Sequence, residues 1–235
     1  MNQQLLLEVI PAPSPTLDDT ITGQNAAALA AAKTLAPGRA MYLWEPPGSG
    51  RTHFLRAMCA DRSSVYVDFS TPGPDILDLA TGGRHGSHQL IAIDDIQRMS
   101  PEQLSGVFAL YNHWRESSSS STAFALAVTG DRSASAMDMR EDLRTRLGWD
   151  LVFRLSPLSD EDKREALQSY TEKKGLPFSA EVLQWMFTYY SRDIRQLFAL
   201  ADALDRYSLS HHRPVTVPLI RTMLSDRDFL KSHDS

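Results

Sequence analysis

The sequence lacks the features that mark secreted and membrane-spanning proteins. It has a single cysteine, Cys59, so no disulfide can form within the chain, which fits a reducing compartment. No apolar run approaches the ~20 residues that a membrane-spanning helix needs. The first eight residues, MNQQLLLE, have neither the basic stretch nor the small-residue cleavage pattern of a signal peptide. These absences predict a cytoplasmic protein with no membrane partner.

An excess of positive charge is also missing. The chain has 24 lysines and arginines against 29 acidic residues, which gives a net charge of −5. Proteins that grip nucleic-acid phosphates usually carry a basic patch or tail. Here the arginines alternate with acids, as in residues 138–144 (DMREDLR), a pattern typical of a solvated, paired surface. We therefore expect no strong sequence-specific DNA binding.

Prolines and apolar runs indicate how the chain is organised. Residues 11–16 (PAPSPT) cannot form a helix or an inner strand, so residues 1–16 are expected to be a flexible arm. Continuous apolar strands that alternate with helices then predict an α/β domain, residues 17–155, with a parallel five-stranded sheet between helices. The expected strands are 40–44, 65–69, 90–93, 124–129 and 151–155, and the expected helices are 25–36, 52–60, 101–116 and 136–147.

Only helices are expected after residue 155. Ser159 and Asp162 form a capping-box pattern that opens a helix, and Gly175 closes it. Ser179 caps a second helix, and Pro218 fits the first turn of the last one. We expect a small all-helical domain at 156–226 and a C-terminal tail at 227–235.

A phosphate-binding loop is predicted between the first strand and its helix. Residues 45–52 (EPPGSGRT) nearly match the pattern GxxxxGK(S/T), in which backbone N–H groups and a helix N-terminus face phosphate oxygens. The alternative is a plain Pro-Gly turn, which the flanking strand and helix disfavour. The expected nucleotide-binding residues are Pro47, Gly48, Ser49, Gly50, Arg51, Thr52 and His53, and the Thr52 hydroxyl is also an expected Mg²⁺ ligand.

Two residues depart from that pattern. Glu45 replaces the first glycine, and Arg51 replaces the lysine that reaches the terminal phosphates. Arginine keeps the positive charge but is a planar fork rather than a compact point charge. We therefore expect a site that binds ADP or ATP with Mg²⁺ and has weak or no ATPase activity of its own.

Polar residues follow two further strands. Asp94 and Asp95 come directly after the strand 90–93, where the first would hold Mg²⁺ through water and the second would orient the attacking water. Thr129 and Asp131 follow at the end of the strand 124–129, beside the expected γ-phosphate position. Taken alone, these segments could equally be an acidic turn and an Asx-type turn.

These motifs resemble the AAA+ module of the DnaA family of replication initiators. The similar segments are 17–25, 93–97, 127–132, 144–149 and 192–197, so the resemblance covers nearly the whole chain. It implies that Arg146 is an arginine finger that acts in trans, that Arg195 is the sensor of a helical lid domain, and that Asp95 is catalytic. Without the resemblance, Arg146 would be an ordinary surface residue and Arg195 a partner for acids on its helix.

Within that family the chain is most similar to the short Hda-type regulators. Residues 4–9 (QLLLEV) resemble the peptide with which these regulators dock on the sliding clamp, with Gln4, Leu5, Leu7 and Val9 as its contact residues. Arg51 also suits this branch, and no segment resembles the DNA-binding domain of the initiators.

The resemblance implies a regulator that binds ADP or ATP and the DNA polymerase III sliding clamp. It would stimulate ATP hydrolysis by a DnaA-type initiator and so prevent re-initiation, and it allows a homo-oligomer. Two alternatives stay open. One is a self-sufficient AAA+ ATPase that remodels or loads replication proteins, and the other is a non-enzymatic adaptor that binds the initiator.

Overall fold

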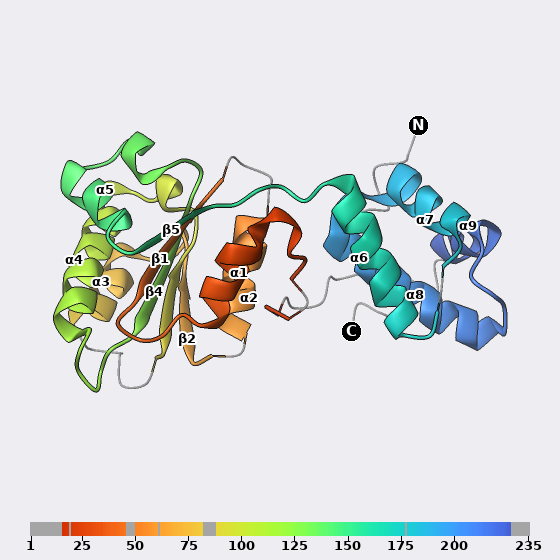
Figure 1. Ribbon diagram of the computed structural model, residues 1–235, viewed down its shortest axis with the longest axis horizontal. Helices are drawn as coiled ribbons and strands as arrows, with labels where there is room; N and C mark the ends of the chain where they lie inside the picture. Colours follow the sequence, from red (N-terminus) through yellow and green to blue (C-terminus); the bar gives the residue numbers. More distant parts are fainter. Residues whose placement is uncertain are drawn as a thin grey trace. The chain divides into compact units, whose positions relative to one another are not determined.

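The computed structural model describes residues 16–18, 20–45, 50–60, 62–81, 88–176 and 178–226, with Arg195 described by its backbone only. These residues form two compact units, one ending at Pro157 and the other beginning at Leu158 (Figure 1). The first is an α/β unit and the second is entirely helical.

The α/β unit is built on a parallel five-stranded sheet, which confirms the predicted fold class. Its strand order is β2-β3-β4-β1-β5, so the strand that leads into the phosphate loop is flanked by two strands from much later in the chain. All the pairings are parallel, with Trp44 of β1 opposite Gly130 of β4 and Arg154 of β5. The strands are β1 (Ala40–Trp44), β2 (Ser64–Val67), β3 (Leu90–Ile93), β4 (Ala125–Gly130) and β5 (Leu151–Arg154).

Helices cover both faces of this sheet, as Figure 1 shows. The helices α1 (Ala26–Lys33) and α2 (Arg51–Ala60) pack on one face, where Met41, Leu43 and Leu90 meet their apolar residues. On the other face lie α3 (Gly73–Thr81), α4 (Pro101–Ser117) and α5 (Glu141–Leu147). Alternate residues of β1, β2, β3 and β4 therefore enter different clusters, as the side-chain period of a strand requires.

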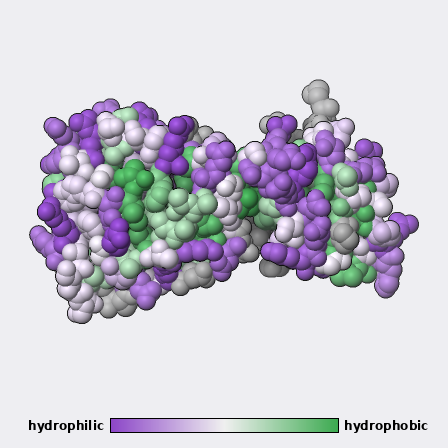
Figure 2. Space-filling view, viewed as in Figure 1, coloured by the Kyte–Doolittle hydropathy of each residue, from purple (hydrophilic) through white to green (hydrophobic). Residues whose placement is uncertain are grey.

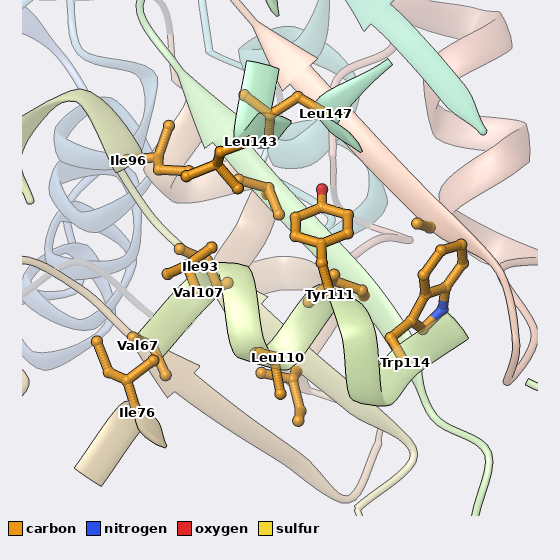
Figure 3. Close-up of a cluster of buried hydrophobic side chains, with 14 of the residues drawn as sticks. Val67, Ile76, Ile93, Ile96, Val107, Leu110, Tyr111, Trp114, Leu143 and Leu147 are labelled. Carbon is orange, nitrogen blue, oxygen red and sulfur yellow. The ribbon is translucent and has the colours of Figure 1, made fainter. Parts of the chain in front are cut away.

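The cluster under α4 is shown in Figure 3. Val107, Leu110 and Tyr111 of α4 are all at most 1% exposed, and they pack against strand residues such as Val67 and Ile93. Full burial of each large apolar side chain contributes roughly 1.5–3 kcal/mol. Because Leu143 and Leu147 enter the same cluster, this burial also fixes α5 against α4.

Some predicted boundaries were wrong for local reasons. The helix expected at 136–147 is a 3-10 turn, Ala134–Ala136, followed by an extended Met137 that is buried in the core. The α-helix begins only at Glu141, where two acidic residues suit a helix N-terminus. The strand β2 ends at Val67 rather than at residue 69, because Asp68 accepts a hydrogen bond from the Ser70 N–H at 2.8 Å and turns the chain. The helix α3 was not predicted.

The helical unit has its own core. Ser159 and Asp162 form the predicted capping box, Gly175 has φ +74°, and Ser179 accepts from the Val182 N–H. The π-helical turn η4 (Met186–Tyr190) continues directly from α7. Buried residues such as Leu167, Leu200 and Ile220 hold the unit together. Its helices are α6 (Asp160–Lys173), α7 (Ala180–Trp185), α8 (Ile194–His211) and α9 (Val217–Ser225), with Pro218 in the first turn of α9.

Hydrophilic residues cover much of the visible face of each unit (Figure 2). In the part of the chain that the structure describes, no helix is both long and apolar enough to cross a bilayer.

Candidate functional site

The N-terminus of α2 directly follows the predicted phosphate loop. Gly50 has φ +104°, a conformation that L side chains rarely adopt, and its carbonyl accepts from the Phe54 N–H at 2.9 Å. Arg51 then begins the helix, with Thr52 and His53 half-buried in its first turn. Pro47, Gly48 and Ser49 lie outside the described residues. A helix N-terminus with free N–H groups is a favourable place for an anion.

Arg51 is bound on one side only. It is buried, and its Nη2 donates to Oδ1 of Asp95 at 2.8 Å. Its Nη1 is buried without a hydrogen-bond partner among the described residues. A buried guanidinium N–H without an acceptor is costly, so this donor is suited to an incoming anionic oxygen.

Three strand ends meet at Asp94, which is 4% exposed. The Tyr66 hydroxyl of β2 donates to its Oδ2, and the Thr129 hydroxyl of β4 donates to its Oδ1, both at 2.5 Å. Thr129 also accepts from the backbone N–H of Asp95 at 2.9 Å. The structure thus joins the predicted residues Asp94, Asp95 and Thr129, and it adds Tyr66.

Tyr66 was missed because no motif marks it. Burial raises the pKa of its hydroxyl, and the hydrogen bond to Asp94 raises it further. Tyr66 pairs with Ala92 in the sheet, so it reaches Asp94 from the neighbouring strand. Once the strand order is known, a tyrosine in the strand next to β3, which ends in the acidic residues, is a signal that could identify Tyr66.

Asp95 has a left-handed backbone, with φ 48° and ψ 54°. For a residue other than glycine this conformation costs on the order of 1–3 kcal/mol, and such strain gathers at functional sites. Here the hydrogen bond to Thr129 and the ion pair with Arg51 hold Asp95 in this conformation. Arg98, one turn on, lies 3.9 Å from its second carboxylate oxygen.

Asp131 belongs to a separate ion pair. Its carboxylate accepts two hydrogen bonds from Arg132, at 2.8 and 2.7 Å, which hold the pKa of Asp131 below its usual range. Its backbone N–H donates to the Gln97 side chain at 3.2 Å. Asp131 is therefore near the end of β4 as predicted, but it is bound to Arg132 rather than to the group around Asp94.

Arg146, in α5, is held by aromatic residues. Its Nη1 donates to the Phe108 carbonyl at 3.0 Å, and its guanidinium lies 3.5 Å from the centre of the Phe108 ring. Trp149 also lies against it at 5.2 Å. Burial lowers the pKa of Arg146, and the nearby Arg115 and Arg140 lower it further, while Asp142 opposes them. These contacts are with α4 and Trp149, not with the group around Asp94.

The other predicted residues receive no side-chain description. Arg195 lies in the first turn of α8, with only its backbone described. Gln4, Leu5, Leu7 and Val9 lie outside the described residues, so the clamp-binding peptide stays a prediction.

The described residues fit a phosphate better than a free metal ion. Arg51 and the α2 N-terminus supply donors for a phosphate. No group of three or more His, Cys, Asp or Glu in the described ranges could hold a metal ion. Thr52 would supply one oxygen and Asp94 would act through water, so a Mg²⁺ there would draw its other ligands from water and phosphate, as is usual for this ion.

Solved structures with a similar fold come from replication and recombination proteins. Domain III of the replication initiation protein DnaA from Thermotoga maritima matches with a TM-score of 0.63 and 21% identity, over 94% of this chain and 99% of that one. AMPPCP-bound DnaA from Aquifex aeolicus gives a TM-score of 0.59 at 17% identity, over 82% and 65% of the two chains. The RuvB Holliday junction branch migration motor of T. maritima gives 0.60 at 14% identity, over 92% and 72%.

The parallel sheet, with α2 after β1 and two acids after β3, belongs to a fold like that of DnaA domain III. In addition, residues 160–224 match the family model described as the Hda lid domain. The resemblance seen in the sequence is therefore supported by the fold of the chain and by the family match of its lid.

Proposed function

We propose that the chain is a regulator of replication initiation that stimulates ATP hydrolysis by a DnaA-type initiator. The observation that carries the proposal is Arg146, a guanidinium held on an aromatic support, whose described contacts do not include the chain's own Arg51–Asp95 pair. The Hda-type lid supports it. In this assignment residues 1–16 are a docking arm, 17–155 the nucleotide domain, 156–226 the lid and 227–235 a tail.

The nucleotide of the chain's own site is an adenine nucleotide in this proposal. Two similar structures are DnaA proteins described as bound to AMPPCP. Arg51 Nη1 and the α2 N-terminus would hold its phosphates, and Thr52 and Asp94 would hold Mg²⁺. Because Asp95 already occupies one side of Arg51, ADP is expected to bind better than ATP.

Slow turnover follows from the same ion pair. Asp95 can orient an attacking water only with a free carboxylate oxygen, and Arg51 and Arg98 both lie against it. This arrangement disfavours the self-sufficient ATPase, whose Asp95 would have to leave Arg51 in every cycle. It does not separate the regulator from the adaptor, since both tolerate slow turnover.

The finger would act on the initiator's nucleotide. A guanidinium supplied in trans stabilises the charge that develops on the transferring phosphoryl group, and such fingers are worth about 10³–10⁵ in rate. Arg146 is half-buried, so leaving the Phe108 ring costs between about 0.5 and 2 kcal/mol, and losing the hydrogen bond to the Phe108 carbonyl costs about 1.5–3 kcal/mol more. Contacts to the partner's phosphate would replace both. Arg195 would instead act in cis as the lid sensor, so its loss is expected to weaken the chain's own nucleotide binding first.

The experiment measures ATP hydrolysis by the initiator, with DNA-loaded clamp and full-length protein. Arg146→Ala is expected to fold, to keep ADP and clamp binding, and to lose stimulation. Arg146→Lys is expected to fail largely as well, since an ammonium lacks the planar fork. Arg144→Ala, on the same helix, is the matched control and should stimulate normally.

Three outcomes would count against the regulator. Full stimulation by Arg146→Ala would favour the adaptor, and loss of ADP from Arg146→Ala with normal stimulation per complex would show that the finger acts in cis. Brisk Mg²⁺-dependent turnover by the isolated wild-type chain would favour the self-sufficient ATPase.

A further inference from the structure

Glu45 is buried in an environment that does not suit its charge. Its side chain is 1% exposed, and both carboxylate oxygens are buried without a hydrogen-bond partner in the described part of the chain. Its backbone N–H donates to the Gly130 carbonyl at 3.2 Å, which fixes the residue where β1 enters the phosphate loop. A buried carboxylate without donors is strongly disfavoured, and such a group tends to bind a proton instead.

The charges that act on Glu45 come from one residue at the start of α2 and one at the end of β5. Arg51 of α2 and Arg154 of β5 both favour its ionised form, but burial outweighs them and raises the pKa of Glu45 to about 7. Asp131 and Arg132, which follow β4, neutralise each other in an ion pair at 2.7 Å. Residues 46–49 (PPGS) contain no ionisable side chain. Glu45 therefore changes its protonation state near neutral pH.

Arg51 has too few free donors to bind Asp95, Glu45 and a phosphate at once. Its Nη2 is bound to Asp95, and its Nη1 is the donor left for a phosphate. A phosphate group bound there adds negative charge beside a cation that already acts on the Glu45 carboxyl. Like charges disfavour ionisation, so the bound phosphate raises the pKa of Glu45 above its value in the free protein.

We propose that Glu45 is a proton-linked residue of the nucleotide site, which takes up one proton from solvent when a nucleotide phosphate binds beside Arg51. The inference rests on the proposed nucleotide binding and adds to it a residue that no phosphate-loop pattern contains. No covalent bond to the phosphate forms or breaks.

Proton uptake makes nucleotide affinity depend on pH. Below pH 7 Glu45 is already protonated in the free protein, so binding carries no protonation cost. Above pH 7 each pH unit weakens binding by up to tenfold, until the higher pKa of the bound form is passed. The terminal phosphate of ADP titrates near pH 6, so it is ionised throughout the range from pH 7 to 8.5.

The test is titration calorimetry of ADP with the full chain between pH 7 and 8.5. Each pH is measured in two buffers of different ionisation enthalpy, which gives the number of protons taken up. For the wild type we expect Kd to rise about tenfold across this range, with uptake approaching one proton per ADP near pH 7.5 to 8.

Two variants separate the charge of Glu45 from its shape. Glu45→Gln keeps the size of the side chain, and Glu45→Gly restores the residue usual at this position. Both are expected to bind ADP with a Kd independent of pH and without proton uptake, and to bind more tightly than the wild type at pH 8.5. Glu141→Gln, the same change on the exposed first turn of α5, should keep the wild-type slope. Thermal melting of each variant shows that it is folded.

Three results would overturn the inference: a pH-independent Kd in the wild type, an unchanged slope in both Glu45 variants, or no ADP binding at any pH. Initiator hydrolysis measured in parallel at pH 7 separates it from the proposed function. If the Kd for ADP depends on pH but the initiator is not stimulated, only the proposed regulator function is refuted. If the initiator is stimulated but the Kd does not depend on pH, only the proton uptake by Glu45 is refuted.

Discussion

Arg51 and Asp95 form an ion pair of 2.8 Å across the candidate site, with side chains that are only 8% and 19% exposed. One residue stands where a phosphate-loop lysine is usual, and the other follows the acidic strand β3. The cation proposed to bind phosphate and the acid proposed to orient water therefore bind each other.

Asp95→Asn is expected to strengthen ADP binding. Asparagine tolerates the left-handed backbone that Asp95 adopts, so the change removes charge with little strain. Release of Arg51 should improve Kd about threefold to tenfold, since a hydrogen bond to a charged group is worth roughly 1.5 kcal/mol. Calorimetry measures it, with Asp138→Asn as the control. A large loss of ADP affinity would show instead that Asp95 orients Arg51 for phosphate.

Gly130→Ala is expected to destabilise the α/β unit. A Cβ at Gly130 would collide with the Tyr42 hydroxyl and the Met137 methyl group, both of which are packed in place. Overpacking of this kind costs about 1–3 kcal/mol, which urea denaturation can measure. At Gly148 an added Cβ would meet its nearest neighbour, the Thr145 carbonyl, at 3.5 Å, so Gly148→Ala is the matched control and should change stability little. Equal effects of the two changes would contradict this view of the β4 end.

Asp150→Asn is expected to lower stability at neutral pH and to lower it less in acid. Asp150 accepts from Arg39 at 2.7 and 2.6 Å and from the Ala40 N–H, contacts that lower its pKa. Because the folded pKa lies below the unfolded value of about 3.9, the contribution is present above that value. It is lost as the pH falls through the folded pKa.

The size of the Asp150 effect is modest because Arg39 is half-exposed and screened by solvent. We expect about 1 kcal/mol at pH 7 and a smaller difference at pH 3, from urea denaturation at both. Asp138→Asn again provides the control. A difference that grows in acid would have the wrong sign and would refute the assignment.

Replacing Gln4 and Leu5 with alanine is expected to abolish clamp pull-down. A peptide that docks in a groove concentrates its binding energy in a few anchors, so two truncations should suffice. ADP affinity should be unchanged, because the arm precedes the nucleotide domain. Substituting Ser14 with alanine, within the proline-rich segment, is the control. Equal clamp binding by a chain that lacks residues 1–10 would rule this docking mode out.

Local patterns predicted most of the fold. The five apolar runs became the five strands, and the caps at Ser159 and Ser179 were found where the sequence placed them. The helix α3 escaped because it is short and opens with Gly73 and Pro74, residues that usually mark turns. Met137 interrupted an expected helix because its burial in the core outweighed local helical preference.

The site was predictable only where it follows a motif. The acids after β3 and the loop before α2 were visible in the sequence, as was Thr129. The contact of Tyr66 with Asp94 depends on β2 lying beside β3, and the ion pair of Arg51 with Asp95 depends on β3 and β1 ending at the same edge of the sheet. Such pairings between distant segments are set by the strand order, which no single stretch of sequence contains.

The position of β1 in the sheet has a consequence for how the protein is made. β1 pairs only with β4 and β5 among the described strands, and both are synthesised long after it. While the chain emerges from the ribosome, the strand that leads into the phosphate loop therefore waits without its hydrogen-bonding neighbours. Because β5 ends at Arg154, a nascent chain that stops before it leaves one edge of this apolar strand unpaired.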